Sequence, residues 1–166
     1  MFTMLKMESS DYCPDRKEVD FCEIVRQICA EYYEEMSYVE VDIDIPEYAI
    51  KVMADESLIT RTVANLVTNA IKYNQTGSKL EIKVCEKIDS VSLIVSDDGT
   101  EIADEVKERM FLAFVRGDAS RKSTGGTGLG LAIARGIAKK HGGDVTYHYE
   151  DERNRFSLVL PTVRDK

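Results

Sequence analysis

The order in which two hydrophobic periodicities follow one another along the chain constrains its fold most. Apolar residues recur at the three- and four-residue spacing of helices over residues 20–32, 55–74 and 129–141. Pairs of short segments with strand-like patterns lie between these helices and after the last one. Helices that alternate with strand pairs predict an α/β two-layer sandwich, in which helices cover one face of a mixed, mainly antiparallel sheet.

Polar residues and glycines mark the ends of the predicted helices. Asp20 is placed to cap the first helix, and Asp55 opens the second, which we expect to end at residues 75–77. The third helix runs over 129–141 and stops before a pair of glycines. We expect a shorter helix over residues 103–110.

Six strands are expected, at residues 39–45, 49–53, 80–84, 91–95, 145–149 and 155–160. We expect the first two to form a hairpin around Pro46, and the last two to close the sheet around a polar turn. Residues 1–16 show weak periodicity and contain a proline, so we interpret them as a segment that leads into one domain over residues 17–166.

Composition limits the classes of function. With 166 residues, of which 43% are hydrophobic, the chain can bury the core of one domain. A formal net charge of -8 argues against nonspecific binding to nucleic acid, which needs an excess of Lys and Arg. A nucleotide is also a polyanion, so an acidic protein would hold one with locally concentrated cations, a metal ion or backbone N–H donors.

The cysteines and histidines give no sign of a zinc site. The 4 cysteines form no Cys-x-x-Cys pair and there are 2 histidines, so we expect reduced, structural thiols. No apolar run approaches the roughly 20 residues that cross a bilayer. We therefore expect a cytoplasmic domain without membrane contact of its own, whether or not a longer parent protein is anchored in a membrane.

The second predicted helix carries a polar face. Asn65, Asn69, Lys72 and Tyr73 are spaced so that they share the side opposite the apolar residues. An amide oxygen is a suitable ligand for a magnesium ion that also binds phosphate, and a lysine one turn away can meet the same phosphates. An ordinary solvated helix face explains the same residues when they are considered alone.

A glycine-rich stretch, Gly125-Gly126-Thr127-Gly128-Leu129-Gly130, directly precedes the third helix. Free backbone N–H groups at the start of a helix can hold phosphate, and glycines let the chain approach it closely. The stretch lacks the Gly-Lys-Ser/Thr of a P-loop and follows a polar loop instead of a strand, which excludes the dinucleotide fingerprint. A flexible loop before a helix cap is the alternative interpretation.

Two further groups of residues fit a nucleotide site. Asp97 to Gly99 ends an apolar strand, where a carboxylate could accept a hydrogen bond from an exocyclic amine such as that of adenine. Phe111 and Phe114 lie before a polar loop, in which Arg116 and Arg121 could reach phosphate. Taken singly, these features are also typical of a turn and of a core anchor beside a loop.

In this order, the four segments resemble the catalytic, ATP-binding domain of sensor histidine kinases, over about residues 17–162. Residues 65–73 resemble its N box, residues 97–99 its first glycine box, residues 111–114 its F box and residues 126–131 its second glycine box.

The resemblance implies a role for each of these segments. Asn69 would ligate magnesium, Lys72 would contact phosphate, Tyr73 would lie against the base, and Asp97 would hold the adenine amine, with residues 116–126 as the ATP lid. The other residues implied in binding the nucleotide are Gly99, Ile102, Phe114, Arg116, Arg121, Gly126, Thr127, Gly128, Leu129 and Gly130.

Asn65 separates the histidine kinases from related ATPases, such as gyrase and the mismatch-repair proteins, which carry a glutamate at this position to activate water. An amide cannot act as that base. We therefore expect slow hydrolysis of ATP and transfer of the γ-phosphoryl group to a nucleophile from outside, with Asn65 and Lys72 as the catalytic residues.

The acceptor histidine of the family lies on a separate helical hairpin, and neither His141 nor His148 is placed to replace it. His141 would end a helix and His148 lies in a strand, so both are interpreted as structural. The expected partners are that histidine-bearing dimerisation hairpin, of which residues 1–10 are a candidate stub, and a downstream response regulator. Nucleic acid is not expected as a partner.

Glu101 departs from the Pro-Gly that the family usually has after its first glycine box. If its side chain points at the base, it would weaken nucleotide binding by a few tenfold factors, each about 1.4 kcal/mol. Glu101 thus leaves a nucleotide-binding module with little catalytic activity as an alternative function. Two further alternatives are a serine kinase of the anti-sigma-factor type, although the lid and N box resemble the histidine kinases more, and a stand-alone ATPase, which Asn65 disfavours.

Overall fold

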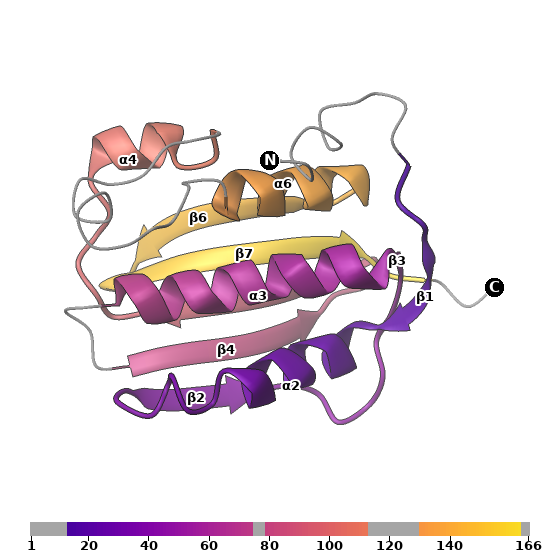
Figure 1. Ribbon diagram of the computed structural model, residues 1–166, viewed down its shortest axis with the longest axis horizontal. Coiled ribbons are helices and arrows are strands. Elements are labelled where there is room, and N and C mark those ends of the chain that lie inside the picture. Colours follow the sequence, from indigo (N-terminus) through magenta and orange to yellow (C-terminus); the bar gives the residue numbers. More distant parts are fainter. Residues whose placement is uncertain (1–12, 75–78, 113–129, 164–166) are drawn as a thin grey trace.

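The computed structural model describes residues 13–74, 79–112 and 130–163. Within them, three longer helices, α2 (Phe21–Glu31), α3 (Glu56–Tyr73) and α6 (Gly130–Lys140), lie on one face of a five-stranded sheet (Figure 1). The short helix α4 (Asp104–Arg109) follows the sheet's central strand. The predicted α/β two-layer sandwich is confirmed.

The sheet is mixed and mainly antiparallel, as predicted. Its strands, in spatial order, are β2 (Glu40–Asp44), β4 (Lys79–Glu86), β5 (Ser90–Asp97), β7 (Arg153–Pro161) and β6 (Asp144–Glu150). Only the β2–β4 pairing among them is parallel. In β4, β5 and β7 alternate apolar residues face the helices, and Ile82, Leu93 and Leu158 are fully buried there.

The predicted hairpin between residues 39–45 and 49–53 is wrong. β2 pairs in parallel with β4, whereas β3 (Lys51–Ala54) pairs antiparallel with β1 (Lys17–Asp20) in a separate two-stranded sheet. Alternation shows which face of a strand is buried but does not name its partner. β1 itself was not predicted, because four residues with Val19 as their single apolar side chain give no periodic signal.

The predicted cap at Asp20 is confirmed, and Asp55, expected as the first residue of the second helix, is its N-cap. Asp20 Oδ1 accepts a hydrogen bond from Cys22 N at 3.0 Å, and Asp55 Oδ1 accepts one from Leu58 N at 3.4 Å. α6 ends in a Schellman motif, in which the two glycines at positions 142 and 143 donate to Lys139 O and Ala138 O at 3.1 and 2.8 Å. The first of these glycines has a φ of 78°, which favours glycine.

The cysteines form no disulfide, as predicted. Cys22 and Cys29 are buried in the core, and burial raises the pKa of Cys29 to about 11, while Cys13 is exposed. Each helix within the described ranges is too short or too polar to span a bilayer.

Candidate functional site

One end of the sandwich brings together the segments that the sequence singled out. The C-terminal half of α3, the end of β5 and the start of α6 lie at the left of Figure 1. Asn65 Nδ2 donates to Gly130 O at 3.2 Å, which joins α3 to the first residue of α6. Leu80 pairs with Asp97, so the end of β5 lies beside the strand that follows α3.

The polar face of α3 is confirmed by burial. Asn65, Asn69 and Lys72 are half-buried, whereas Leu66 and Ala70 on the other side of the helix are buried. Helical spacing of three and four residues explains this division. α3 continues through residue 73, but the side chain of Tyr73 lies outside the described part of the chain, so its role stays a prediction.

Asp97 ends β5 with its carboxyl group nearly enclosed, since the residue is 7% exposed. Oδ1 accepts hydrogen bonds from Gly99 N at 2.9 Å and from Asn154 Nδ2 at 3.1 Å. Among the described residues, no donor to Oδ2 is found. Burial raises the pKa of Asp97, and these two hydrogen bonds oppose that rise. The aspartate therefore has one oxygen left for a donor from outside.

A second hydrogen-bond network holds the segment after Asp97. Asn154 Nδ2 also donates to the carbonyl oxygens of Gly99 and Thr100, at 3.2 and 3.0 Å. Tyr147 OH donates to Asn154 Oδ1 at 2.5 Å and accepts from Ile102 N at 3.4 Å. The loop that carries Gly99 and Ile102 is thus tied to both β6 and β7.

Sequence reasoning missed Asn154 and Tyr147. A weak signal existed, because extending the alternation of Phe156 and Leu158 by one step puts Asn154 on the face that packs against the helices. A polar side chain on that buried face either destabilises the fold or belongs to a site where it has hydrogen-bond partners. Pairing of Asn154 with Asp97 across β7 and β5 could not be read from the sequence.

Glu101 points toward α4. Its carboxylate pairs with Lys107 Nζ, which also lies 3.3 Å from Asp104 Oδ1. The Glu101 side chain is 45% exposed. The interaction fixes where the charge lies, at the rim of the candidate site, and leaves the effect of Glu101 on nucleotide binding as a prediction.

The predicted F box is described only in part. Phe111 is half-buried, and the guanidinium of Arg135 from α6 lies 4.9 Å from the centre of its ring. The other predicted site residues of this region lie outside the described residues and stay predictions: Phe114, Arg116, Arg121, Gly126, Thr127, Gly128 and Leu129. A Cβ added to Gly130 would meet no atom of the described residues within 4 Å.

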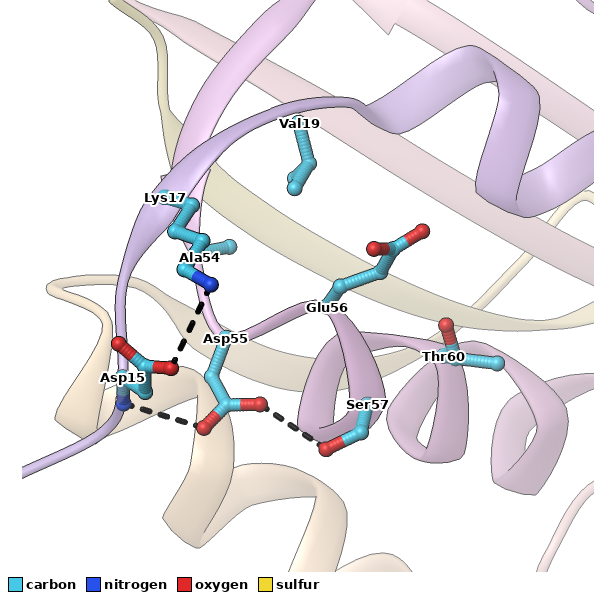
Figure 2. Close-up of a pocket in the computed structure, with 8 residues that line it drawn as sticks. All are labelled: Asp15, Lys17, Val19, Ala54, Asp55, Glu56, Ser57 and Thr60. Atoms are coloured by element: carbon cyan, nitrogen blue, oxygen red, sulfur yellow. Dashed lines mark hydrogen bonds and ion pairs between the residues drawn. The ribbon is translucent and has the colours of Figure 1, made fainter.

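A depression at the other end of α3 does not fit a polyphosphate. Asp15, Asp55 and Glu56 give it an acidic wall, with Lys17 as the cation among its lining residues (Figure 2). Asp15 N donates to Asp55 Oδ2 at 3.1 Å, so the segment before β1 lies against the N-cap of α3. Within the described ranges, no group of three His, Cys, Asp or Glu side chains could hold a metal ion.

His141 is structural, as predicted. It is 4% exposed, its Nε2 accepts from Asp55 N at 3.0 Å, and its Nδ1 lies 2.7 Å from Ile137 O. Because Asp55 N is a donor, the ring hydrogen belongs on Nδ1 and the imidazole is neutral. Burial is the main cause of the lowered pKa of His141. His148, in contrast, is exposed on β6.

The amino-acid sequence is similar to one known family and to sensor kinases within it. Residues 54–164 match the family model described as "Histidine kinase-, DNA gyrase B-, and HSP90-like ATPase". The sensor-like histidine kinase SenX3 of Mycobacterium tuberculosis is 32% identical over 167 positions, which cover 98% of this chain and 40% of SenX3. The sensor histidine kinase HprS of Escherichia coli is 37% identical over 133 positions, covering 76% of this chain and 29% of HprS. The chain thus spans less than half the length of these relatives.

Solved structures share the fold. The catalytic domain of the histidine kinase ThkA superimposes with a TM-score of 0.77 at 27% identity, covering 89% of this chain and 95% of ThkA's chain. Full-length ShkA, solved in complex with AMPPNP, gives a TM-score of 0.82 at 22% identity, over 98% of this chain and 34% of ShkA. ThkA has also been solved in complex with the response regulator protein TrrA; that chain gives a TM-score of 0.73 at 24% identity, covering 89% of this chain and 42% of its own.

Proposed function

Because this chain belongs to the histidine kinase-, DNA gyrase B- and HSP90-like ATPase family, as the ATP-binding domain of a sensor kinase, we propose that it binds Mg-ATP and transfers the γ-phosphoryl group to a histidine on a separate domain. The observation that carries the proposal is the convergence at one end of the sandwich of Asp97, the polar face of α3 and the start of α6. A carboxylate for a base, a cation for phosphates and a helix N-terminus then lie within one site.

The base would bind at the end of β5. Oδ2 of Asp97 is the acceptor left for the exocyclic amine of adenine, and the loop through Gly99 and Ile102 would form the adjoining wall. Tyr73 would lie against the base. This arrangement would distinguish adenine from bases that present an acceptor at the same position.

The phosphates would lie between α3 and α6. Lys72 would contact them from α3, and the N–H groups at the start of α6 would meet them with the positive end of the helix dipole. The residues proposed to complete the phosphate site and its lid are Phe114, Arg116, Arg121, Gly126, Thr127, Gly128, Leu129 and Gly130.

Asn69 fits a magnesium ion by its chemistry and position. It lies one turn from both Asn65 and Lys72 on a half-buried face, and a hard ion accepts one amide oxygen together with phosphate oxygens and water. When bound, the ion would neutralise charge on the phosphates.

Asn65 supports transfer over hydrolysis. Its Nδ2 donates to Gly130 O, so this side chain already serves as a donor, and an amide has no basic group with which to take a proton from water. We propose that bound ATP is hydrolysed slowly and that Asn65 and Lys72 hold the triphosphate for an outside nucleophile.

We propose that this chain alone does not phosphorylate itself on histidine. Both ring nitrogens of His141 are engaged in the core. His148 is exposed on edge strand β6, on the opposite face from its neighbour Tyr147, which packs against the core. The acceptor would belong to a histidine-bearing hairpin, and a response regulator would receive the phosphoryl group next, which the ThkA–TrrA complex supports.

The proposal is tested by mixing the chain with radiolabelled ATP, magnesium and the histidine-bearing hairpin of a sensor kinase relative. We expect acid-labile label on the hairpin and none on a hairpin in which the histidine is replaced by alanine. Acid-stable label would indicate a serine kinase. ATP binding without label would indicate a binding module, and rapid release of phosphate would contradict the role given to Asn65.

A further inference from the structure

A buried amide outside the predicted motifs contacts the candidate base site. Asn154 is 4% exposed and lies opposite Asp97 in the pairing of β7 with β5. Its Nδ2 lies within 3.0–3.2 Å of three oxygens, Asp97 Oδ1, Gly99 O and Thr100 O. An amide at this place is therefore in contact with the whole turn that follows β5.

The orientation of this amide is determined by its neighbours. All three atoms near Nδ2 are acceptors, so this end must be the NH₂ group. Oδ1 in turn accepts the hydroxyl hydrogen of Tyr147, whose oxygen also accepts from Ile102 N. Because both ends of the Asn154 amide are engaged, the side chain has one way to lie.

This arrangement selects which oxygen of Asp97 remains for a ligand. Asn154 and Gly99 N both bind Oδ1, so the carboxylate cannot rotate about its Cβ–Cγ bond without giving up two hydrogen bonds. Oδ2 is left as the acceptor. A carboxylate that rotates freely loses conformational entropy when a ligand binds to it. The hydrogen bonds to Oδ1 already fix the Asp97 carboxylate, so this cost does not fall on ligand binding.

We propose that Asn154 is a positioning residue for base recognition: it holds the carboxylate of Asp97 and the Gly99–Thr100 turn in the one orientation that accepts an exocyclic amine. Asn154 does not contact the nucleotide itself. This inference rests on the proposed function, because it assumes that Asp97 contacts adenine.

The test compares ATP with purine riboside triphosphate, which lacks the exocyclic amine, by calorimetry in the presence of magnesium. We expect the wild-type chain to prefer ATP by about tenfold or more, as one hydrogen bond to a charged acceptor allows. Asn154→Ala should lose this preference to within about threefold, while its affinity for purine riboside triphosphate stays within about threefold of wild type. A merely structural role would weaken both ligands equally.

Three further variants make the result decisive. Asp97→Asn should also lose the preference, and the double variant should be no worse than Asp97→Asn, because both act through one hydrogen bond. Tyr147→Phe keeps its ring against Phe156, whose centroid is 5.0 Å away, and should show an intermediate loss even if Asn154→Ala folds poorly. Ser157→Ala, on the opposite face of β7, should keep the full preference.

Different failures overturn different statements. If the wild-type chain binds neither nucleotide, the proposed function fails and takes this inference with it. If it binds both equally, or if Asn154→Ala and Tyr147→Phe keep the preference for ATP, nucleotide binding stands and the positioning role is wrong. A second readout is the pH dependence of ATP affinity. As the pH is lowered, protonation of Asp97 should weaken ATP binding, and this loss should begin at a higher pH in Asn154→Ala than in wild type. The variant lacks a hydrogen bond that favours ionised Asp97, so the pKa of Asp97 is higher.

Discussion

At the scale of single residues, the charge of Glu101 is expected to weaken ATP binding, because Glu101 lies in the loop after β5 that borders the candidate base site. The carboxylate sits at the rim, paired with Lys107. We expect Glu101→Gly to tighten ATP binding by up to about tenfold, equal to about 1.4 kcal/mol, because a negative charge next to a polyanion is removed. Calorimetry measures the affinity.

Two variants separate the causes of that effect. Glu101→Gln keeps the size of the side chain and removes its charge, so equal tightening by both substitutions would assign the effect to charge. Glu108→Gln makes the same change at an exposed position of α4 and should leave affinity unchanged. Unchanged or weaker binding by both Glu101 variants would contradict any unfavourable effect of Glu101.

Asn69 gives the second prediction at this scale. If its amide oxygen ligates magnesium, ATP should bind more tightly with magnesium than with EDTA in the wild-type chain, and Asn69→Ala should reduce this difference to near zero. Thr68→Ala is the matched control, because the Thr68 hydroxyl bonds back to Ala64 O within α3 at 2.8 Å. A full magnesium effect in Asn69→Ala would remove Asn69 as the ligand.

What could be predicted among the site residues depends on sequence distance. The shared face of Asn65, Asn69 and Lys72 follows from the period of one helix, so spacing alone was sufficient. The contact between Asn154 and Asp97 joins residues 57 positions apart and depends on which strands pair. No periodicity carries that information, which is why the positioning amide was missed.

At the scale of elements, the end of α6 explains why a glycine stands at position 143. A Cβ added to Gly143 would lie 1.9 Å from Val159 O on β7, so the helix end and the sheet meet here by their backbones. We expect Gly143→Ala to lower the free energy of unfolding by at least about 2 kcal/mol, because the backbone must shift. Urea unfolding measures the loss.

The matched control is the same substitution at the other end of α6. Within the described ranges, a Cβ added to Gly130 meets no atom within 4 Å, and alanine has the better helix propensity. Gly130→Ala should therefore leave stability unchanged or raise it by up to about 1 kcal/mol. Equal stability of the two variants would show that the close approach to Val159 does not constrain the fold.

The helices and most strands were predictable because each forms from a local pattern. The cap Asp20 could also be predicted, since a cap bonds to N–H groups two or three residues away. The pairing of β2 and β3 with distant strands was not, because β4 and β1 lie far from them in sequence. Local patterns specified the elements, and long-range packing specified their partners.

At the scale of the whole molecule, His141 links the end of α6 to the start of α3 and makes stability depend on pH. Its neutral ring accepts a hydrogen bond from Asp55 N. Burial and, to a smaller extent, the charge of Arg16 lower the pKa of His141, while the hydrogen bond to Ile137 O and the Asp55 carboxylate oppose this. The unfolded chain, with an ordinary histidine pKa of about 6.5, therefore binds the proton first. Stability should be full above pH 7 and fall as the pH drops below about 6.5.

The expected loss between pH 7.5 and 5.5 is about 1 kcal/mol, since one proton contributes at most about 1.4 kcal/mol per pH unit. Urea unfolding at these two pH values measures it. His141→Gln should be less stable at pH 7.5 but show a smaller loss on acidification, whereas His148→Gln, at an exposed position, should behave as wild type. An equal loss in wild type and His141→Gln would assign the pH dependence to other groups.

The contact between Asp15 and the N-cap of α3 affects how far an acceptor domain fused before this chain would lie from the phosphate site. A domain fused ahead of Cys13 would join the sandwich at this end. Lys72 lies 17 residues after the N-cap Asp55, near the opposite end of α3, which is about 25 Å away at 1.5 Å per residue. A tethered acceptor would have to fold back along the whole sandwich or be supplied by another chain. Tether length would then set the local concentration of the acceptor, and a short tether would favour phosphorylation between molecules.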